Sequence, residues 1–304
     1  MLKTLSTLLL TFFFSIGAVW AGDYADGDAA LVKKDYATAL KKYGLAAAQG
    51  NSGAQANIGV MYNNGMGVKK DSAEAIRWYK LAAAQGNAVA QNNLGLMYSE
   101  GDGVVQDYAE AAKWYKLAAA QGFSIAQLRV AYMYRFGKGV IQDYAEAIRW
   151  YKLSAVQGLS DAQFNLGYMY SKGEGVIQDY AEAMRWYKLA ASRNDANAQV
   201  FLGYMYQNGE GVLQDYTEAI NWYRLAAKQG VADAQYNLAS MYFSGQGVLQ
   251  DYVRAHMWSN LASVNSEENK KKRDAIGSFM TPQQIAEAQK LARECQARNF
   301  KNCD

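Results

Sequence analysis

The sequence predicts an all-α solenoid in which pairs of antiparallel helices are stacked. A motif built around tryptophan recurs every 36 residues along most of the 304-residue chain. A period of this length is typical of stacked helical repeats. The chain has a single proline and is 51% hydrophobic, which excludes collagen, Pro-rich and disordered classes. The repeated tryptophans are Trp78, Trp114, Trp150, Trp186, Trp222 and Trp258.

The period divides the chain into four regions. Residues 1–21 are expected to be a signal peptide, 22–50 an N-terminal capping half-repeat, and 267–304 a C-terminal capping helix and tail. Six full repeats lie between them. They are expected to stack on one another, because one helix pair alone cannot bury its apolar face. They cover residues 51–86, 87–122, 123–158, 159–194, 195–230 and 231–266.

Each repeat is predicted to form two helices. In the first repeat, apolar residues at helical spacing predict a helix over Ala54–Asn64, which a left-handed Gly65 ends. The second helix begins at an N-cap, Asp71, and Glu74 completes a pattern like a capping box. Gly86 and its counterparts end the second helix, and Asn194, which also tolerates the left-handed conformation, takes that place once.

The residues that recur from repeat to repeat also predict how the helices pack. Small residues such as Gly59 and Ala75 let helices approach closely, and Trp78, Tyr79 and Leu81 are expected to fill the space between repeats.

The first 21 residues have the layout of a secretory leader. Lys3 precedes an apolar stretch, and Ala21 is a small residue before the expected cut. A retained anchor is the alternative, since about 20 residues can just cross a bilayer. We expect cleavage after Ala21, a periplasmic or secreted protein, and no transmembrane segment in the mature chain.

Composition excludes several kinds of chemistry. The formal charge of +3 is too balanced to predict nucleic-acid binding. His256 is the only histidine and stands where other repeats have a packing residue, so we expect neither a metal site nor a cofactor. Cys295 and Cys303 are the only thiols; they form either one disulfide that holds the tail or two free or intermolecular thiols.

The repeat resembles the Sel-one-like repeat (SLR), a relative of the tetratricopeptide repeat. The resemblance covers about residues 35–266 and rests on A-Q-x-x-L-G-x-M-Y, G-x-G-V and D-Y-A-E-A-x-x-W-Y-K-L-A-A-x-Q-G recurring in register. Residues Met280–Glu294 resemble the closing helix of bacterial members. The family implies a right-handed superhelical α-solenoid that acts as a binding scaffold, and it leaves the partner open.

An enzyme of the β-lactamase or penicillin-binding type is the main alternative, because cysteine-rich SLR relatives have been described as such. Those relatives have a cysteine pair in each repeat, whereas all six repeats here lack cysteine. The S-x-x-K signature of serine β-lactamases is also missing. We therefore expect no catalysis.

A partner is expected to bind to one face of the first helices. Residues that vary between repeats there fall at i, i+4, i+7 and i+8, which is one helical face. We expect this face to line a concave groove with aromatic and arginine anchors, or else to pack between neighbouring first helices. The candidate residues are Leu128, Arg129, Tyr132, Arg135, Phe136, Phe164, Tyr168, Tyr204 and Tyr236.

The second helices carry paired charges, such as Glu146 with Arg149, and a row of lysines that includes Lys80 and Lys116. Paired charges of both signs are typical of a solvated face. The sequence thus predicts an exported scaffold for a protein or peptide partner, with a glycan as a further possibility and a purely structural spacer as the third. It gives neither the partner nor the oligomeric state.

Overall fold

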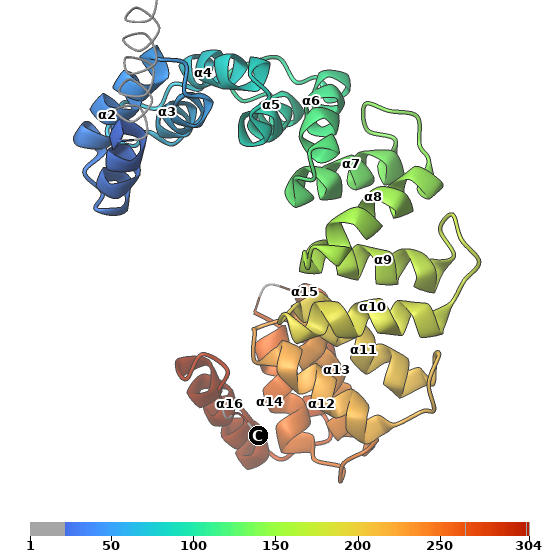
Figure 1. Cartoon of the computed structure of the whole chain (residues 1–304). Helices are drawn as coiled ribbons and strands as arrows, with labels where there is room; N and C mark the ends of the chain where they lie inside the picture. Colours follow the sequence, from blue (N-terminus) through green and yellow to red (C-terminus); the bar gives the residue numbers. More distant parts are fainter. Residues whose placement is uncertain (1–21, 265, 302, 304) are drawn as a thin grey trace, which may run out of the picture. The chain divides into compact units, whose positions relative to one another are not determined.

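A computed structural model describes residues 22–264, 266–301 and 303 of the chain, and its regular elements over these residues are all helices (Figure 1). The expected leader, residues 1–21, lies outside the described residues. The chain divides into two compact halves: the N-terminal half ends at Ser154 and the C-terminal half begins at Ala155. None of the described helices is long and apolar enough to cross a lipid bilayer.

The helix pairs follow the predicted period. Residues 22–32 are helical and precede α2 (Tyr36–Ala48). The first helices of the six repeats are α3 (Ser52–Asn64), α5 (Ala88–Glu100), α7 (Ser124–Phe136), α9 (Ser160–Lys172), α11 (Ala196–Asn208) and α13 (Ala232–Ser244). The second helices are α4 (Ser72–Ala84), α6 (Tyr108–Ala120), α8 (Tyr144–Val156), α10 (Tyr180–Ser192), α12 (Tyr216–Ala227) and α14 (Tyr252–Ala262).

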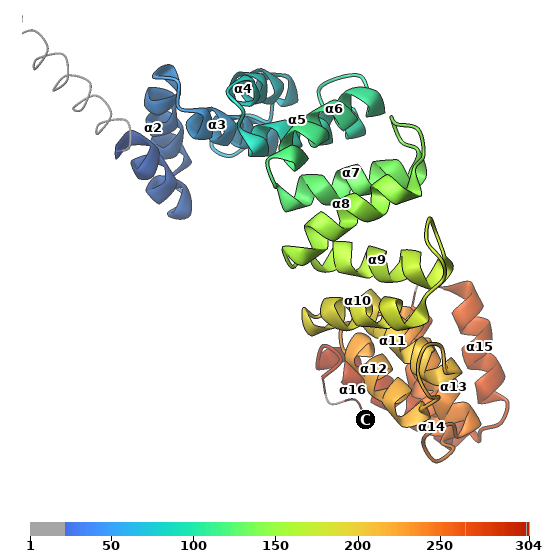
Figure 2. The same ribbon diagram turned by 45° about the vertical axis from the view of Figure 1, so that its right-hand side comes forward.

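Within each half, successive helices pack against one another (Figure 2). The all-α solenoid predicted from the period is confirmed. The helix ends agree with the sequence as well, because Gly65 ends α3 with φ +67° and Gly86 follows α4 with φ +84°. Asn194 is left-handed with φ +65°, as its substitution for glycine predicts.

The N-caps of the second helices differ from the expected capping box. The Asp71 side chain accepts a hydrogen bond from the Glu74 backbone N–H at 2.9 Å. The Asp71 backbone N–H, however, donates to the Tyr62 carbonyl of the first helix. Glu74 is therefore not needed for the reciprocal bond and pairs with Arg77 at 3.0 Å. Half of the box is formed, and its other half is replaced by a bond that joins the two helices of the repeat.

A buried tyrosine on the second helix forms the centre of each of the first five repeats. The side chain of Tyr79 is 2% exposed, and its ring lies directly against Gly59 of the first helix. Alanines such as Ala75 and Ala82 are fully buried around it. The expectation that Leu81 fills the space between repeats is wrong, since it is 52% exposed. Its position, two residues after the buried tyrosine, turns it toward solvent.

Glutamines connect each repeat to the next. Gln91 of α5 is buried, and its Nε2 donates to the Ala83 carbonyl near the end of α4. Its Oε1 accepts from Gln121 Nε2 at 2.7 Å. Gln55 and Gln199 accept in the same way from the glutamine 30 residues later. These recurrent amides add a further hydrogen bond to helix-end carbonyls, since the Ala83 carbonyl also accepts from the Gly86 N–H, and they connect one repeat to the next.

The loops between the two helices of a repeat also contact the preceding repeat. A Cβ at Gly103 would lie 2.7 Å from the Ser72 side chain at the start of α4, and Gly103 has φ +71°. Only glycine meets both requirements without strain, since it has no side chain and tolerates positive φ. These loops therefore fix the stacking of repeats, and they are not free hinges.

Two further helices close the C-terminal half. α15 (Glu267–Gly277) and α16 (Pro282–Ala297) both pack on α14. Thr281 begins α16 with a complete capping box, and Pro282 stands at its first turn. Cys295 is buried and is joined to Cys303 by a disulfide that attaches the tail to α16.

Candidate partner-binding surface

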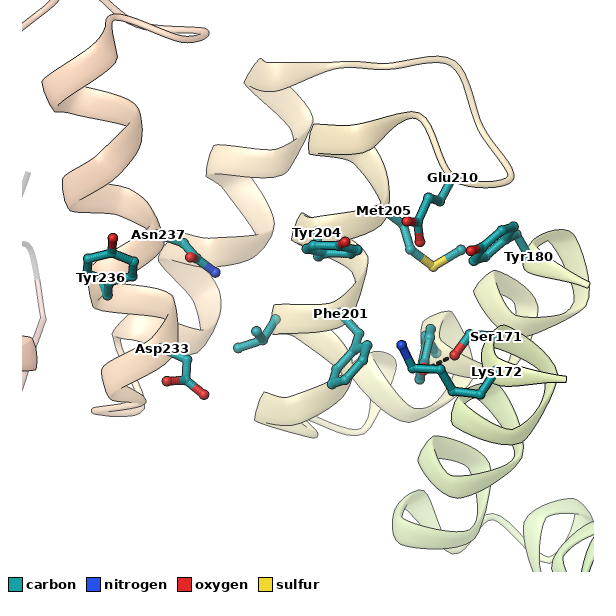
Figure 3. A pocket seen from close by; sticks show the side chains of 12 residues that line it. Ser171, Lys172, Tyr180, Phe201, Tyr204, Met205, Glu210, Asp233, Tyr236 and Asn237 are labelled. Carbon is teal, nitrogen blue, oxygen red and sulfur yellow. Dashed lines mark hydrogen bonds between the residues drawn. The ribbon is translucent and has the colours of Figure 1, made fainter. Parts of the chain in front are cut away.

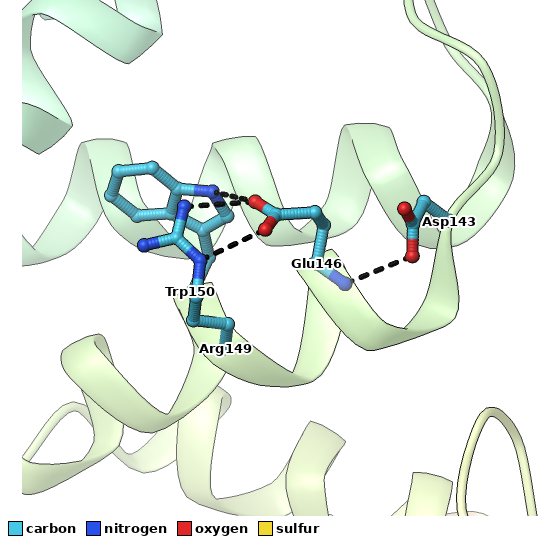
Figure 4. A network of polar contacts seen from close by, with 4 residues as sticks. All are labelled: Asp143, Glu146, Arg149 and Trp150. Atoms are coloured by element: carbon cyan, nitrogen blue, oxygen red, sulfur yellow. Dashed lines mark hydrogen bonds and ion pairs between the residues drawn. The ribbon is translucent and has the colours of Figure 1, made fainter.

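The charged face of the second helices is engaged within the chain. Glu146 of α8 accepts from Arg149 and from the indole N–H of Trp150 at 3.1 Å (Figure 4). The hydrogen bonds from Arg149 hold the pKa of Glu146 below its ordinary value. The Arg149 guanidinium also lies 4.4 Å from the Trp150 ring. This network fixes the three side chains on the surface of α8. Because Glu146 accepts three hydrogen bonds within its own helix, it has little capacity left to bind a partner.

The lysine row of the second helices joins neighbouring repeats. Lys80 Nζ lies 6.0 Å from the ring centroid of Tyr98, and Lys116 Nζ lies 4.8 Å from that of Tyr134. In both pairs the tyrosine belongs to the first helix of the next repeat. A lysine over an aromatic face is attracted by the ring quadrupole. These lysines are thus part of the stacking and do not form a free basic stripe.

An exposed aromatic patch lies at the end of α7 in the N-terminal half. The rings of Tyr132 and Phe136 are 4.5 Å apart, and these side chains are 43% and 48% exposed. Lys138 Nζ lies 5.3 Å from the Tyr132 centroid and 5.5 Å from that of Tyr108. We call Tyr132, Phe136 and Lys138 the α7 patch. It offers apolar area and a positive charge to solvent at one place.

The other candidates on α7 are less accessible. Arg135 is only 7% exposed, with its guanidinium 5.0 Å from the Phe136 ring centroid. Arg129 is half-buried and donates to the Tyr115 hydroxyl at 3.4 Å. Leu128 is also half-buried. Arg135 therefore packs against the α7 patch and Arg129 against Tyr115, whereas Tyr132 and Phe136 are exposed to solvent.

Four aromatic side chains cluster in the C-terminal half. Phe164 and Tyr168 of α9 contact Phe201 of α11, with ring centroids 5.5 and 5.9 Å apart in edge-on geometry. The buried Tyr187 of α10 lies beneath them, 5.3 Å from Phe201. Edge-on and tilted rings are favoured arrangements for aromatic pairs. Phe164 and Tyr168 thus pack between neighbouring first helices.

A cavity of about 380 Å³ opens beside this cluster (Figure 3). Its lining comes from α9, α10, α11 and α13 and includes Phe201, Tyr204 and Tyr236. Tyr204 is 47% exposed, so it offers a partner an aromatic surface that the fold does not use. Ser171 is buried at the margin, where its hydroxyl shares a hydrogen bond with the Tyr187 hydroxyl at 3.3 Å. The sequence-predicted Tyr204 and Tyr236 therefore meet at one cavity.

Charged groups line the same cavity. Lys172 stands at the end of α9, Glu210 lies in the loop after α11, and Asp233 lies in the first turn of α13. Lys172 Nζ is 5.9 Å from the Tyr168 ring centroid. The lining thus combines aromatic faces with one ammonium and two carboxylates, which is suited to oriented recognition of a polar ligand.

Sequence reasoning missed Phe201 as a cavity residue. The equivalent position is asparagine in four of the six repeats, Arg129 in the third and Phe201 in the fifth. The single apolar residue at this otherwise polar repeat position would have been found by comparing every position across the six repeats. Glu210 and Asp233 carry no comparable signal, because acidic residues at exposed helix ends are common.

Nucleophilic chemistry has few candidates here. His256 is 3% exposed and packs beneath α15, and both cysteines are disulfide-bonded. Across residues 22–264, 266–301 and 303, no three His, Cys, Asp or Glu side chains converge as a metal site would require. The α7 patch and the cavity contain neither histidine nor cysteine, and they have the character of binding surfaces.

Comparison with known proteins identifies the repeat. The Sel1 repeat model matches seven consecutive stretches: residues 17–51, 52–87, 88–123, 124–159, 160–195, 196–231 and 232–263. The first of these includes residues 22–50, where the structure has the helical segment 22–32 and α2. Comparison with curated proteins gives no significant match.

Solved structures give the same result. A Sel1 repeat protein from Oxalobacter formigenes is 40% identical with a TM-score of 0.71, over 79% of this chain and 98% of that one. A protective antigen of uropathogenic Escherichia coli with an SLR fold is 27% identical with a TM-score of 0.39, over 95% and 86% of the two chains. A sel1 repeat protein from Klebsiella pneumoniae is 21% identical with a TM-score of 0.43, over 66% and 97%. On the family match and the Oxalobacter structure, the chain belongs to the Sel1 repeat family.

Proposed function

We propose that this chain is a non-catalytic scaffold that binds a protein partner through the solvent-facing side of its first helices. The observation that carries the proposal is the exposed Tyr204 at the mouth of the cavity between α9, α11 and α13. Exposed aromatic side chains beside a cavity are typical anchors for a partner. The α7 patch is proposed as a second contact in the N-terminal half.

The proposal includes export and excludes catalysis. The arrangement of Lys3, the apolar stretch and Ala21 supports a leader that directs the chain to the periplasm or beyond. The disulfide between Cys295 and Cys303 suits an oxidising compartment. Burial of the only histidine, His256, leaves no accessible imidazole for acid–base chemistry.

The test is site-specific photo-cross-linking in the producing cell. A photoreactive amino acid replaces Tyr204 on α11 in one variant and Leu189 on α10 in a control variant. Both positions are similarly exposed, at 47% and 40%, but Leu189 lies on a second helix outside the cavity. We expect a discrete cross-linked protein from position 204 and none from position 189.

A replacement at Tyr132 extends the test to the α7 patch. Capture of the same partner at positions 132 and 204 would support a contact with that partner in each half. Equal capture at 189 and 204 would contradict the assignment of the face. Absence of any cross-link from all three positions would contradict the scaffold role.

A further inference from the structure

The aromatic faces around the cavity favour a cation. Tyr204 is 47% exposed, Tyr236 is half-buried, and Phe201 lines the cavity and contacts Tyr168 of α9. The faces of aromatic rings carry partial negative charge and attract ammonium and guanidinium groups. An apolar ligand would gain area from these rings as well, so the charges at the cavity decide between the two.

Two carboxylates without partners line this cavity. Glu210 approaches from the loop after α11, and Asp233 approaches from the first turn of α13 (Figure 3). Within the part of the chain that the structure describes, neither side chain forms an ion pair. Lys172 is the single cationic residue in the lining, and its ammonium lies over Tyr168. The lining therefore carries an excess of one negative charge.

The chain itself places a cation against one of these rings. Lys272 of α15 has its Nζ 4.0 Å from the ring centroid of Tyr236, while Glu268 pairs with the same ammonium at 2.8 Å. Tyr236 also lines the cavity, to which Tyr204 and Asp233 contribute the same two kinds of group, an aromatic ring and a carboxylate. Lys272 shows that this part of the C-terminal half accommodates an ammonium beside such groups.

We infer that the cavity receives the basic side chain, arginine or lysine, of an extended peptide segment of the partner. This inference rests on the proposed function and specifies its ligand. A peptide suits the site better than a small free cation, because the lining extends over α9, α11 and α13 and one cation would contact only part of it. Asp233 and Glu210 neutralise the charge, Tyr204 packs on its stem, and Lys172 faces an acceptor elsewhere on the segment.

The test uses short random peptides displayed on phage and selected on the full-length protein. Selected peptides are synthesised, and their affinities are measured by calorimetry for the wild type and for Tyr204→Ala. Each arginine is then replaced by citrulline, which keeps the shape and removes the charge, and each lysine by norleucine. We expect replacement of one basic residue to weaken binding about tenfold, the equivalent of about 1.4 kcal/mol.

Matched variants assign the counter-ion. Asp233→Asn should reproduce the loss, and Asp161→Asn should not, because Asp161 occupies the same repeat position on α9 but does not line the cavity. Asp233→Lys should restore binding to a peptide in which the basic residue is exchanged for glutamate. Circular dichroism checks that each variant remains folded.

The outcomes separate the two proposals. Peptides that need Tyr204 but tolerate citrulline or norleucine would overturn the inference and leave the scaffold role standing. Preference for acidic peptides, lost in Lys172→Gln, would also overturn it. If no peptide is selected, both the inference and the proposed binding face fail.

Discussion

The ring of Tyr79 occupies the space that a side chain at position 59 would need. A Cβ built on Gly59 would lie 2.6 Å from Cε1 of Tyr79, and Tyr79 is only 2% exposed. Burial also raises the pKa of its phenol to about 12. In the last repeat both residues are replaced: Ala239 takes the place of the glycine, and Ser259 takes the place of the tyrosine. The glycine and the tyrosine therefore form one packing unit.

Gly59→Ala should lower the free energy of unfolding by about 1 kcal/mol, because overpacking costs about 1–3 kcal/mol and the gain in helix propensity is at most about 1 kcal/mol. Ala131 with Tyr151 shows that one repeat accommodates a methyl group, so the cost of overpacking should not reach the upper end of its range. Urea unfolding followed by circular dichroism measures the change. The control is Gly44→Ala, whose methyl group would meet open space and should be neutral or stabilising. Equal losses in both variants would exclude the packing explanation.

Gln91→Met should be more destabilising than Gln121→Met. Gln91 is buried and serves two partners, the Ala83 carbonyl and the Gln121 amide, whereas Gln121 is exposed. Gln91→Met removes two hydrogen bonds at a buried position, each worth about 0.5–1.5 kcal/mol, while water can replace the bonds of the exposed Gln121. Thermal unfolding of the two variants tests the order. The reverse order would mean that the hydrogen bonds of the buried glutamine do not stabilise the stacking of repeats.

Local signals explain why the helices could be predicted so closely. Gly65, Asp71 and Asn194 act through their own backbone or through a residue three positions away, so the repeat reveals them directly. The same reasoning gave the capping box, but it could not reveal that the Asp71 N–H already bonds to Tyr62. That bond depends on how the two helices of a repeat meet.

The binding surface was predictable only in part for the same reason. Tyr132 and Tyr204 were found because they vary between repeats and lie on one helical face. Whether Tyr168 is free or packed depends on Phe201, which is 33 residues away in the next repeat's first helix. The burial of Arg135 likewise depends on neighbours that the helical pattern does not specify.

Asp195→Asn should stabilise the protein at about pH 7. Burial, with a contribution from the nearby Asp161, raises the pKa of Asp195 above the ordinary value of 3.8. The folded state therefore binds the proton more tightly than the unfolded state, and the free energy of unfolding falls as pH rises through this interval. Asparagine lacks the charge but still caps a helix, since Asn51 and Asn87 accept the equivalent bond at their own N-caps.

Melting temperatures of the wild type and Asp195→Asn, measured from about pH 3 to pH 7, test this interpretation. The advantage of the variant should be largest at about pH 7 and should vanish below the ordinary pKa of aspartate, where both proteins are uncharged at this position. Asp161→Asn should give a smaller gain with the same pH dependence. An advantage that does not change with pH would contradict an electrostatic origin.

His256→Met should remove a loss of stability in mild acid. Burial and the charge of Arg273 lower the pKa of His256, and Asp274 opposes them. The unfolded state then binds a proton more readily, so the free energy of unfolding falls as pH drops below the ordinary value of 6.5. Met184 occupies the equivalent position in the fourth repeat, so the substitution suits the packing.

The melting temperature of the wild type and of His256→Met, measured at about pH 7.5 and about pH 5.5, tests this prediction and should fall less in the variant. Because this is the only histidine, an equal fall in both proteins would place the acid sensitivity in other groups. Arg273→Gln, which removes the opposing charge, should give an intermediate fall.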